Sequence, residues 1–324
     1  MKAGKLPENI LLRSVIKPVH KTETGNMISS AGVGEDCAVF MSENDTNTVT
    51  SINTTVLVND GMPTVSLLGA INSVAAGGAK PRAALISLVL PVSSNERCLK
   101  DIMNELIGAA KMLGVDIAGG HTESSKSVQN PILTITAIGE RAKASSIRKA
   151  RPGDTLLVTK DIGLAGSYII ARNQRQKLLD RYPASFIDEA LLTKNHLSVV
   201  PEAAVAASSG DIAMHDASHG GIYTAMWEMA EAAGAGLDIE LERIPIRQQT
   251  VEICDYLDLN PYELLAGGSL LIATKDSQKV IDELSRAGVD AVAVGRFTEG
   301  SDRIIRNGEE TRFLEPFRGD NVIL

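Results

Sequence analysis

The chain has 324 residues, enough for about two domains of ordinary size. Its 32 Lys and Arg residues against 40 Asp and Glu residues give a formal net charge of −8. That balance argues against nucleic-acid or membrane-surface partners bound through phosphate neutralisation. Hydrophobic residues make up 44% and aromatic residues only 3%, so the composition excludes a disordered chain and predicts aliphatic cores.

The cysteines and the apolar runs bear on where the protein works. Cys37, Cys98 and Cys254 are scattered, with no Cys-x-x-Cys pair, so neither a disulfide framework nor a thiolate zinc site is predicted. The longest apolar run, Ala83–Val92, is too short to span a bilayer, and the N-terminus has no apolar signal region. We therefore expect a cytoplasmic protein that lies in no membrane.

The first 150 residues alternate strands and helices. A helix is predicted over Pro7–Lys17, followed by a glycine turn that runs into a short strand ending at Phe40. The later elements are a strand over Thr48–Val58, a helix over Pro63–Gly78, a strand over Ala83–Leu90, a helix over Asn95–Leu113, and strands over Val115–Ala118 and Pro131–Glu140. Gly119–Asn130 is expected to be the loop between the last two strands.

A domain boundary is predicted near residue 150, at Arg151-Pro152-Gly153-Asp154, because a Pro-Gly pair typically forms a turn between elements. The later strands are predicted over Thr155–Thr159, Ile212–His215, Leu237–Leu241, Leu270–Ala273 and Ala291–Gly295, and the helices over Ala165–Leu179, Gly221–Ala233, Gln248–Leu257 and Ser277–Ala287. Arg303–Phe313 is expected to be a hairpin that turns at Asn307-Gly308. We therefore predict an α/β (α+β) fold with two domains, 1–150 and 151–324.

Three glycine-containing segments could carry chemistry. In Gly34-Glu35-Asp36, adjacent carboxylates offer oxygen ligands to magnesium, although a solvated acidic turn has the same pattern. Gly119 and Gly120 would let backbone amides approach an anion, and His121 and Glu123 could bind metal or transfer protons. A glycine turn capped by Thr122 is the alternative for that segment.

The third segment is Met214–Gly221, which ends a strand and opens a helix. Gly220 and Gly221 at a helix N-terminus would form an anion site, whereas Asp216 and Ser218 could simply cap that helix. His215 and His219 are four residues apart, but the intervening loop argues against a zinc pair. No Walker loop, no Gly-x-Ser-x-Gly elbow and no Gly-x-Gly-x-x-Gly dinucleotide motif is present.

The order and spacing of these segments resemble a known superfamily. The series GEDCAV, NSVAAGGAKP, GVDIAGGHTE, RPGDTLLVTKDIG and AMHDASHGG is similar to AIR synthase (aminoimidazole ribonucleotide synthetase) and its relatives. Within that superfamily it looks most like the AIR synthase-related branch that resembles the hydrogenase maturation factor. The resemblance implies a two-domain AIR synthase-like fold, whose N-terminal domain forms a shared barrel in a homodimer. It also implies ATP and Mg²⁺ in a cleft, and an enzyme that phosphorylates or activates an oxygen of a small substrate.

The resemblance further assigns site residues. It places metal ligands at Asp36, His121 and Glu123, and nucleotide contacts at Asp36, at Asn53 and Ser73, and in the glycine segment at Gly119, Gly120 and Thr122. Asp216, with Gly220 and Gly221 beside it, would face the substrate. Asp216 and His121 are the catalytic residues that it implies.

Several positions depart from the family pattern. Asn53 and Ser73 stand where the family usually has Asp, Ala165 stands where close relatives tend to have an acid, and Ser218-His219 replaces a Thr-acid pair. Asp60 could take the second position only if a gap is allowed. No cysteine lies in Asp320–Leu324, so we do not expect the reaction in which the hydrogenase factor carries a carbamoyl group on a terminal cysteine.

The departures leave two functional hypotheses. The first is an ATP-dependent enzyme that retains a changed Mg-ATP site. The second is a dimeric binding or scaffold protein that has lost Mg-ATP binding. Each carboxylate lost at ~4 Å removes on the order of 4 kcal/mol of attraction for each unit of cation charge at an effective dielectric of about 20.

Overall fold

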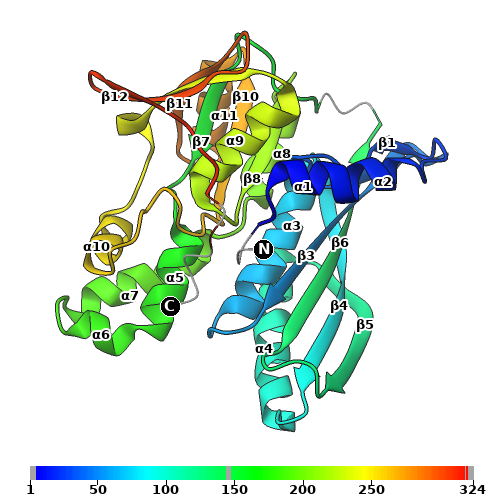
Figure 1. The fold of residues 1–324 in the computed structure, drawn as a ribbon, viewed down its shortest axis with the longest axis vertical. Coiled ribbons are helices and arrows are strands. Elements are labelled where there is room, and N and C mark those ends of the chain that lie inside the picture. The colour runs from blue at the N-terminus through cyan, green and yellow to red at the C-terminus, as the bar shows by residue number, and fades with distance from the viewer. Residues whose placement is uncertain (1–4, 144–146, 318, 320–324) are drawn as a thin grey trace.

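The computed structural model describes residues 5–143, 147–317 and 319. The predictions made for Asp320–Leu324 lie outside these residues. Two β-sheets, each with its own helices, make up the fold (Figure 1). No helix of the described chain is long and apolar enough to cross a membrane. This α/β arrangement confirms the predicted fold class, whereas the domain boundary at residue 150 stays a prediction.

The first sheet has the strand order β1-β2-β3-β6-β4-β5. Its strands are β1 (Met27–Ser29), β2 (Ala38–Phe40), β3 (Thr46–Val56), β4 (Lys80–Pro91), β5 (Asp116–Ser125) and β6 (Ile132–Ala142). Its helices are α1 (Glu8–Leu11), the π-helical η1 (Leu12–Ile16), α2 (Lys17–His20), α3 (Met62–Ala76) and α4 (Glu96–Leu113). The helices α3 and α4 cover one face of this sheet (Figure 1).

The strand β3 shows why the other face of the first sheet is open. Val49, Ser51 and Thr55 alternate with outward residues and are buried against α3. Ile52 and Val56 point the other way and are 72% and 45% exposed. Because a strand presents alternate residues to opposite faces, the open face is partly apolar.

The second sheet has the order β13-β12-β9-β11-β7-β10-β8. Its strands are β7 (Thr155–Thr159), β8 (Ala213–Ala217), β9 (Gly236–Glu240), β10 (Ser269–Thr274), β11 (Ala291–Thr298), β12 (Arg303–Asn307) and β13 (Glu310–Phe313). Its helices are α5 (Leu164–Asn173), α6 (Arg175–Leu179), α7 (Ala184–Leu192), η2 (Thr193–His196), α8 (Val200–Ser208), α9 (Gly221–Ala233), η3 (Leu241–Arg243), α10 (Gln248–Tyr256) and α11 (Ser277–Arg286).

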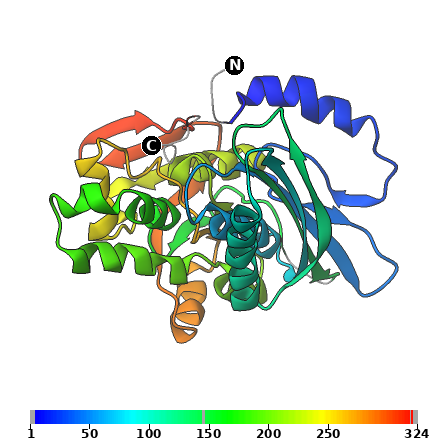
Figure 2. The same cartoon turned by 90° about the horizontal axis from the view of Figure 1, so that it is seen from below.

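The helix α3 joins the two halves of the molecule. It packs on β3 and β6 of the first sheet and also contacts α8 and β8 (Figure 2). The buried Asn72 side chain donates to the Leu197 carbonyl at 2.8 Å and accepts from the Val199 amide at 2.9 Å. The core of the first sheet also takes in Leu164 and Ala165 of α5. The residues of β8 therefore lie where the two halves meet.

Candidate functional site

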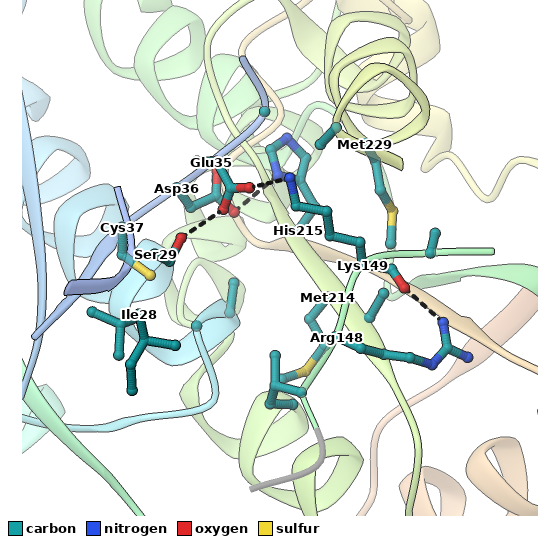
Figure 3. A pocket seen from close by; sticks show the side chains of 18 of the residues that line it. Ile28, Ser29, Glu35, Asp36, Cys37, Arg148, Lys149, Met214, His215 and Met229 are labelled. Atoms are coloured by element: carbon teal, nitrogen blue, oxygen red, sulfur yellow. Dashed lines mark hydrogen bonds and ion pairs between the residues drawn. The ribbon is translucent and has the colours of Figure 1, made fainter. Parts of the chain in front are cut away.

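A chain of charged side chains crosses the junction between the two sheets, and Figure 3 shows its two central members, Asp36 and His215. The β8 residue His215 is 4% exposed, and its Nδ1 lies 2.9 Å from Asp36 Oδ2. Its Nε2 lies 3.6 Å from Glu228 Oε2 on α9, and Lys5 Nζ donates to Glu228 Oε1 at 2.8 Å. The Asp216 amide also donates to Asp36 Oδ2, at 3.0 Å. Asp36 is thus held by two donors from the second half of the chain.

The pKa values of this chain of residues follow from burial and from the paired charges. Burial alone would lower the pKa of His215, but the carboxylates of Asp36 and Glu228 outweigh it and raise that pKa to about 10. Burial alone would raise the pKa of Glu228, but its hydrogen bond to His215 and the charge of Lys5 lower it to about 2. His215 is therefore an imidazolium, and Glu228 is a carboxylate, near neutral pH.

Asp216 is the most unusual group at the junction. Its side chain is 3% exposed, and neither carboxyl oxygen has a hydrogen-bond partner in the described part of the chain. Burial, and then the negative charge of Asp36, raise the pKa of Asp216 well above its ordinary value. A buried polar group without partners is costly, so its presence points to function.

The nearby ion pair between Lys160 and Glu202 does not satisfy Asp216. Lys160 Nζ lies 2.5 Å from Glu202 Oε1 and donates to the carbonyls of His196 and Ser198 at 2.9 and 2.7 Å. These three contacts use all three ammonium protons. Lys160 therefore has no ammonium proton left to donate to Asp216.

The strand–helix turn predicted around Gly220 and Gly221 is present, with φ values of +85° and +74°. A Cβ at Gly220 would lie 2.8 Å from the Phe317 carbonyl oxygen, and one at Gly221 would lie 2.3 Å from the Tyr262 carbonyl oxygen. The Tyr223 amide of the first helical turn donates to Tyr262 at 3.3 Å. Because they have no side chains, the two glycines leave room for the carbonyl groups of Phe317 and Tyr262. Their predicted role in binding an anion stays a prediction.

The loop predicted at Gly119–Asn130 is wrong over its first part, because Gly119–Glu123 belong to the edge strand β5, which pairs with β4 in parallel. A Cβ at Gly120 would lie 1.7 Å from the Ile86 carbonyl oxygen, so close strand packing requires this glycine. The register slips at Leu85, as in a β-bulge. Thr122 is exposed on β5. So are His121 and Glu123, which lie 3.4 Å apart.

The three predicted metal ligands do not meet within one chain. Asp36 precedes β2, and three strands separate β2 from β5, which carries His121 and Glu123. Four strand spacings of about 4.8 Å put these groups roughly 19 Å apart. Among the described residues, no group of three or more His, Cys, Asp or Glu side chains is arranged to hold a metal ion.

Four of the residues that depart from the family pattern lie together, whereas Ser73 does not lie with them. Asn53 lines a cavity of about 30 Å³ with Ala165, Ser218 and His219. Ser73 is not part of that lining, and its hydroxyl donates to the Gly69 carbonyl at 3.1 Å. A cavity of this size holds about one water molecule, so the small cavity does not admit a nucleotide.

Two larger cavities meet at Glu35 and Asp36. One, of about 260 Å³, extends past His215, Met214 and Met229 (Figure 3). The other, of about 570 Å³, lies between the segment that follows α2 and the open face of the first sheet, where Ile52 and Thr136 line it. We call this second cavity the sheet cavity, and its volume is within the range of small-molecule sites.

No sequence motif predicts Glu228, Lys5 or the pairing of His215 with Asp36 as parts of the site. The one available signal was strand alternation, which turns His215 and Asp216 to opposite faces of β8. Contacts between residues so far apart in the chain leave no local pattern.

Comparisons with known proteins identify the family. The models of the AIR synthase related protein N-terminal and C-terminal domains match residues 34–141 and 151–306. A hydrogenase expression/formation protein of Methanocaldococcus jannaschii is 29% identical over 241 residues, covering 72% of this chain and 70% of that protein. The carbamoyl dehydratase HypE of Rhodobacter capsulatus is 26% identical over 267 residues, covering 80% and 74%.

Solved structures show the same fold. In the crystal structure of a HypE–HypF complex, one chain has a TM-score of 0.75 and 19% identity, covering 94% of this chain and 99% of that one. HypE in complex with ATP has a TM-score of 0.71 and 19% identity, covering 100% and 98%. With both domain models in chain order and the fold shared along its length, the chain belongs to the AIR synthase related protein family.

Proposed function

We propose that this chain is an ATP-dependent enzyme that activates or phosphorylates an oxygen atom of a small substrate. Asp216 is the observation that carries the proposal, because a buried carboxyl without partners is costly unless a ligand uses it. A carboxylate whose pKa is raised is a stronger base, and it can take the proton of a substrate hydroxyl while that oxygen forms its bond to the γ-phosphorus of ATP and the bond from that phosphorus to ADP breaks. The names of relatives support the class, since one is a carbamoyl dehydratase and one structure holds ATP.

The nucleotide and its metal can be judged separately against these residues. The sheet cavity of about 570 Å³ beside Asp36 has room for a nucleotide, and we propose that ATP binds there. A magnesium site does not fit one chain, because Asp36 is paired with His215 and lies far from His121 and Glu123. We therefore assign no step to a magnesium ion held by these three residues.

A bulky side chain in the sheet cavity tests where the nucleotide binds. Thr136→Trp is expected to weaken ATP binding at least 10-fold, since Thr136 lines the cavity. The control is Thr134→Trp, two residues earlier on the same strand and outside the cavity lining. Equal affinity of both variants, with unchanged sedimentation, would contradict this placement.

We also propose that the protein is a homodimer joined through the open face of the first sheet. Ile52 on β3 is 72% exposed there, and Leu85 on β4, across the intervening strand β6, is 41% exposed, which is unusual for apolar side chains on one sheet face of a monomer. A second copy would cover them and would close the sheet cavity, because Ile52 lines it.

The dimer has its own test. Ile52→Asp is expected to shift the protein from dimer to monomer in sedimentation velocity, because the interface would have to bury the new charge. Leu192→Asp is the control, since Leu192 is 58% exposed but belongs to α7, away from this sheet. A wild-type protein that still sediments as a monomer at about 50–100 µM would contradict the proposal.

A second candidate function is a dimeric binding protein that has lost ATP. The pairing of Asp36 with His215 favours it, since that carboxylate is already neutralised. The two functions differ in one measurable property, because only the enzyme binds ATP in preference to AMP.

A further inference from the structure

His215 lies between carboxylates that come from different halves of the chain. Its Nδ1 is 2.9 Å from Asp36 Oδ2, and its Nε2 is 3.6 Å from Glu228 Oε2. A neutral imidazole carries a proton on one nitrogen only, and its bare nitrogen would face a carboxylate lone pair. Contacts on both sides therefore require the doubly protonated, cationic ring.

The charges of this cluster balance without a metal ion. Asp36 and Glu228 supply two negative charges, and His215 and Lys5 supply two positive ones. Among the neighbouring charged groups of the 260 Å³ cavity, Lys149 lies 2.7 Å from Glu35, Arg148 lies 2.7 Å from Asp154, and Arg141 donates to the Gly77 carbonyl, so none of them leaves a carboxylate of this cavity unbalanced. The side chains of Asp36, Glu228 and His215 are 18%, 19% and 4% exposed, so water does little to screen these pairs.

We propose that His215 is the resident counter-cation of Asp36, and that Asp36 joins the two halves of the chain instead of holding a divalent metal ion. This differs from the ligand role that the family resemblance implies for Asp36. It does not depend on the proposed function, because a nucleotide bound in the sheet cavity could keep its own magnesium ion without Asp36.

Removing the imidazole ring should uncover the metal preference that the ring suppresses. In His215→Ala, Asp36 and Glu228 would face one shared volume with only Lys5 to balance them. Carboxylate oxygens of this kind are ligands for hard divalent cations. The variant should therefore gain affinity for Mn²⁺ that the wild-type chain lacks.

The experiment is a calorimetric titration of the full chain with Mn²⁺ in the absence of nucleotide, together with thermal unfolding in Mn²⁺ and in EDTA. We expect the wild-type chain to melt at the same temperature in both. His215→Ala should melt lower in EDTA, bind Mn²⁺ at least 10-fold more tightly than wild type, and recover part of its melting temperature in Mn²⁺. The double variant His215→Ala/Asp36→Asn should lose that gain.

Two further variants keep the proposal falsifiable if His215→Ala does not fold. Asp36→Asn should lower the melting temperature and leave the Mn²⁺ response of the otherwise native chain unchanged. His121→Ala removes the exposed imidazole of β5 and identifies any weak Mn²⁺ binding there. Saturable Mn²⁺ binding by the wild-type chain that Asp36→Asn abolishes would overturn the proposal, as would a His215→Ala variant that melts like wild type.

Discussion

Asp216→Leu is expected to make the protein more stable and to abolish its turnover of ATP. The side chain is 3% exposed and both carboxyl oxygens lack partners in the described chain, so no hydrogen bond offsets the free-energy cost of desolvating the carboxyl group. Replacing it by an apolar side chain of similar size should raise the free energy of unfolding by about 1–3 kcal/mol. Loss of a general base should lower kcat by about 100-fold or more. Urea denaturation and a coupled ADP assay measure the two effects.

The matched control for this substitution is Asp154→Leu. Asp154 is equally buried, but its carboxylate accepts from Arg148 at 2.7 and 3.0 Å and from the Arg151 amide at 2.8 Å. Leucine there removes one of the two carboxylates that contact Arg148, leaving Asp211 at 2.8 Å, and takes the acceptor from the Arg151 amide, so it should lower the free energy of unfolding by about 1–3 kcal/mol. If both variants lose stability, the Asp216 carboxyl stabilises the fold through partners of its own, and its assignment as a functional group fails.

The second large effect is a dependence of stability on pH that His215 creates. The pKa of His215 is raised to about 10 in the folded chain against an ordinary value of 6.5. Its contribution is therefore complete below pH 6.5 and is lost as the pH rises toward 10. The slope should approach ~1.4 kcal/mol of unfolding free energy per pH unit. Glu228, with its pKa lowered to about 2 from 4.5, contributes above pH 4.5 and loses that contribution as the pH falls toward 2.

His215→Asn isolates the alkaline slope, because an amide can still donate to Asp36 but does not titrate. The free energy of unfolding of both proteins is best compared between pH 6.5 and 8.5. Above that range the unfolded chain ionises its thiols, whereas burial raises the pKa of Cys37 to about 12 in the folded chain. The charge of His215 lowers the pKa of Asp216, so the slope that Asp216 adds differs between the two proteins. The same comparison in an Asp216→Leu background removes that slope and reports on His215. Parallel curves for the two proteins would show that the imidazolium does not stabilise the fold.

The elements that the sequence predicted well have strong periodicity and clear ends. Thr155–Thr159 is β7 and Gly221–Ala233 is α9, as predicted, and α3 differs from its predicted span by one or two residues at each end. The helix predicted over Ala165–Leu179 is divided into α5 and α6 at Gln174. No Gly or Pro marks that break, and Asn173 beside it exchanges hydrogen bonds with the backbone of Asp60.

The largest error in the fold has a physical reason. Gly119-Gly120 has the composition of a turn, but β5 continues through it, and at Gly120 the neighbouring strand β4 passes too close for a side chain. Only the partner strand β4, which lies about 30 residues earlier, supplies that information. Local composition could not distinguish the two uses of glycine.

The candidate site was predicted in its parts and missed in its pairing. Asp36, Asp216 and the Gly220 turn were identified, and Asp36 and Asp216 do lie together. The expectation that Asp36 would share a metal with His121 and Glu123 ignored the strand order, which puts them at opposite sides of the sheet. The cationic partner that Asp36 does have comes from residue 215, and only the tertiary fold brings it near.

We propose that this chain binds ATP and uses it. The most direct test is a calorimetric titration of the full chain with ATP and with AMP, each in the presence and absence of Mg²⁺. We predict saturable binding of ATP, weaker binding of AMP, and a gain of about 2.7 kcal/mol in unfolding free energy at an ATP concentration 100 times Kd. No heat and no stabilisation with ATP, with or without Mg²⁺, would contradict the claim and favour the binding protein that has lost its nucleotide.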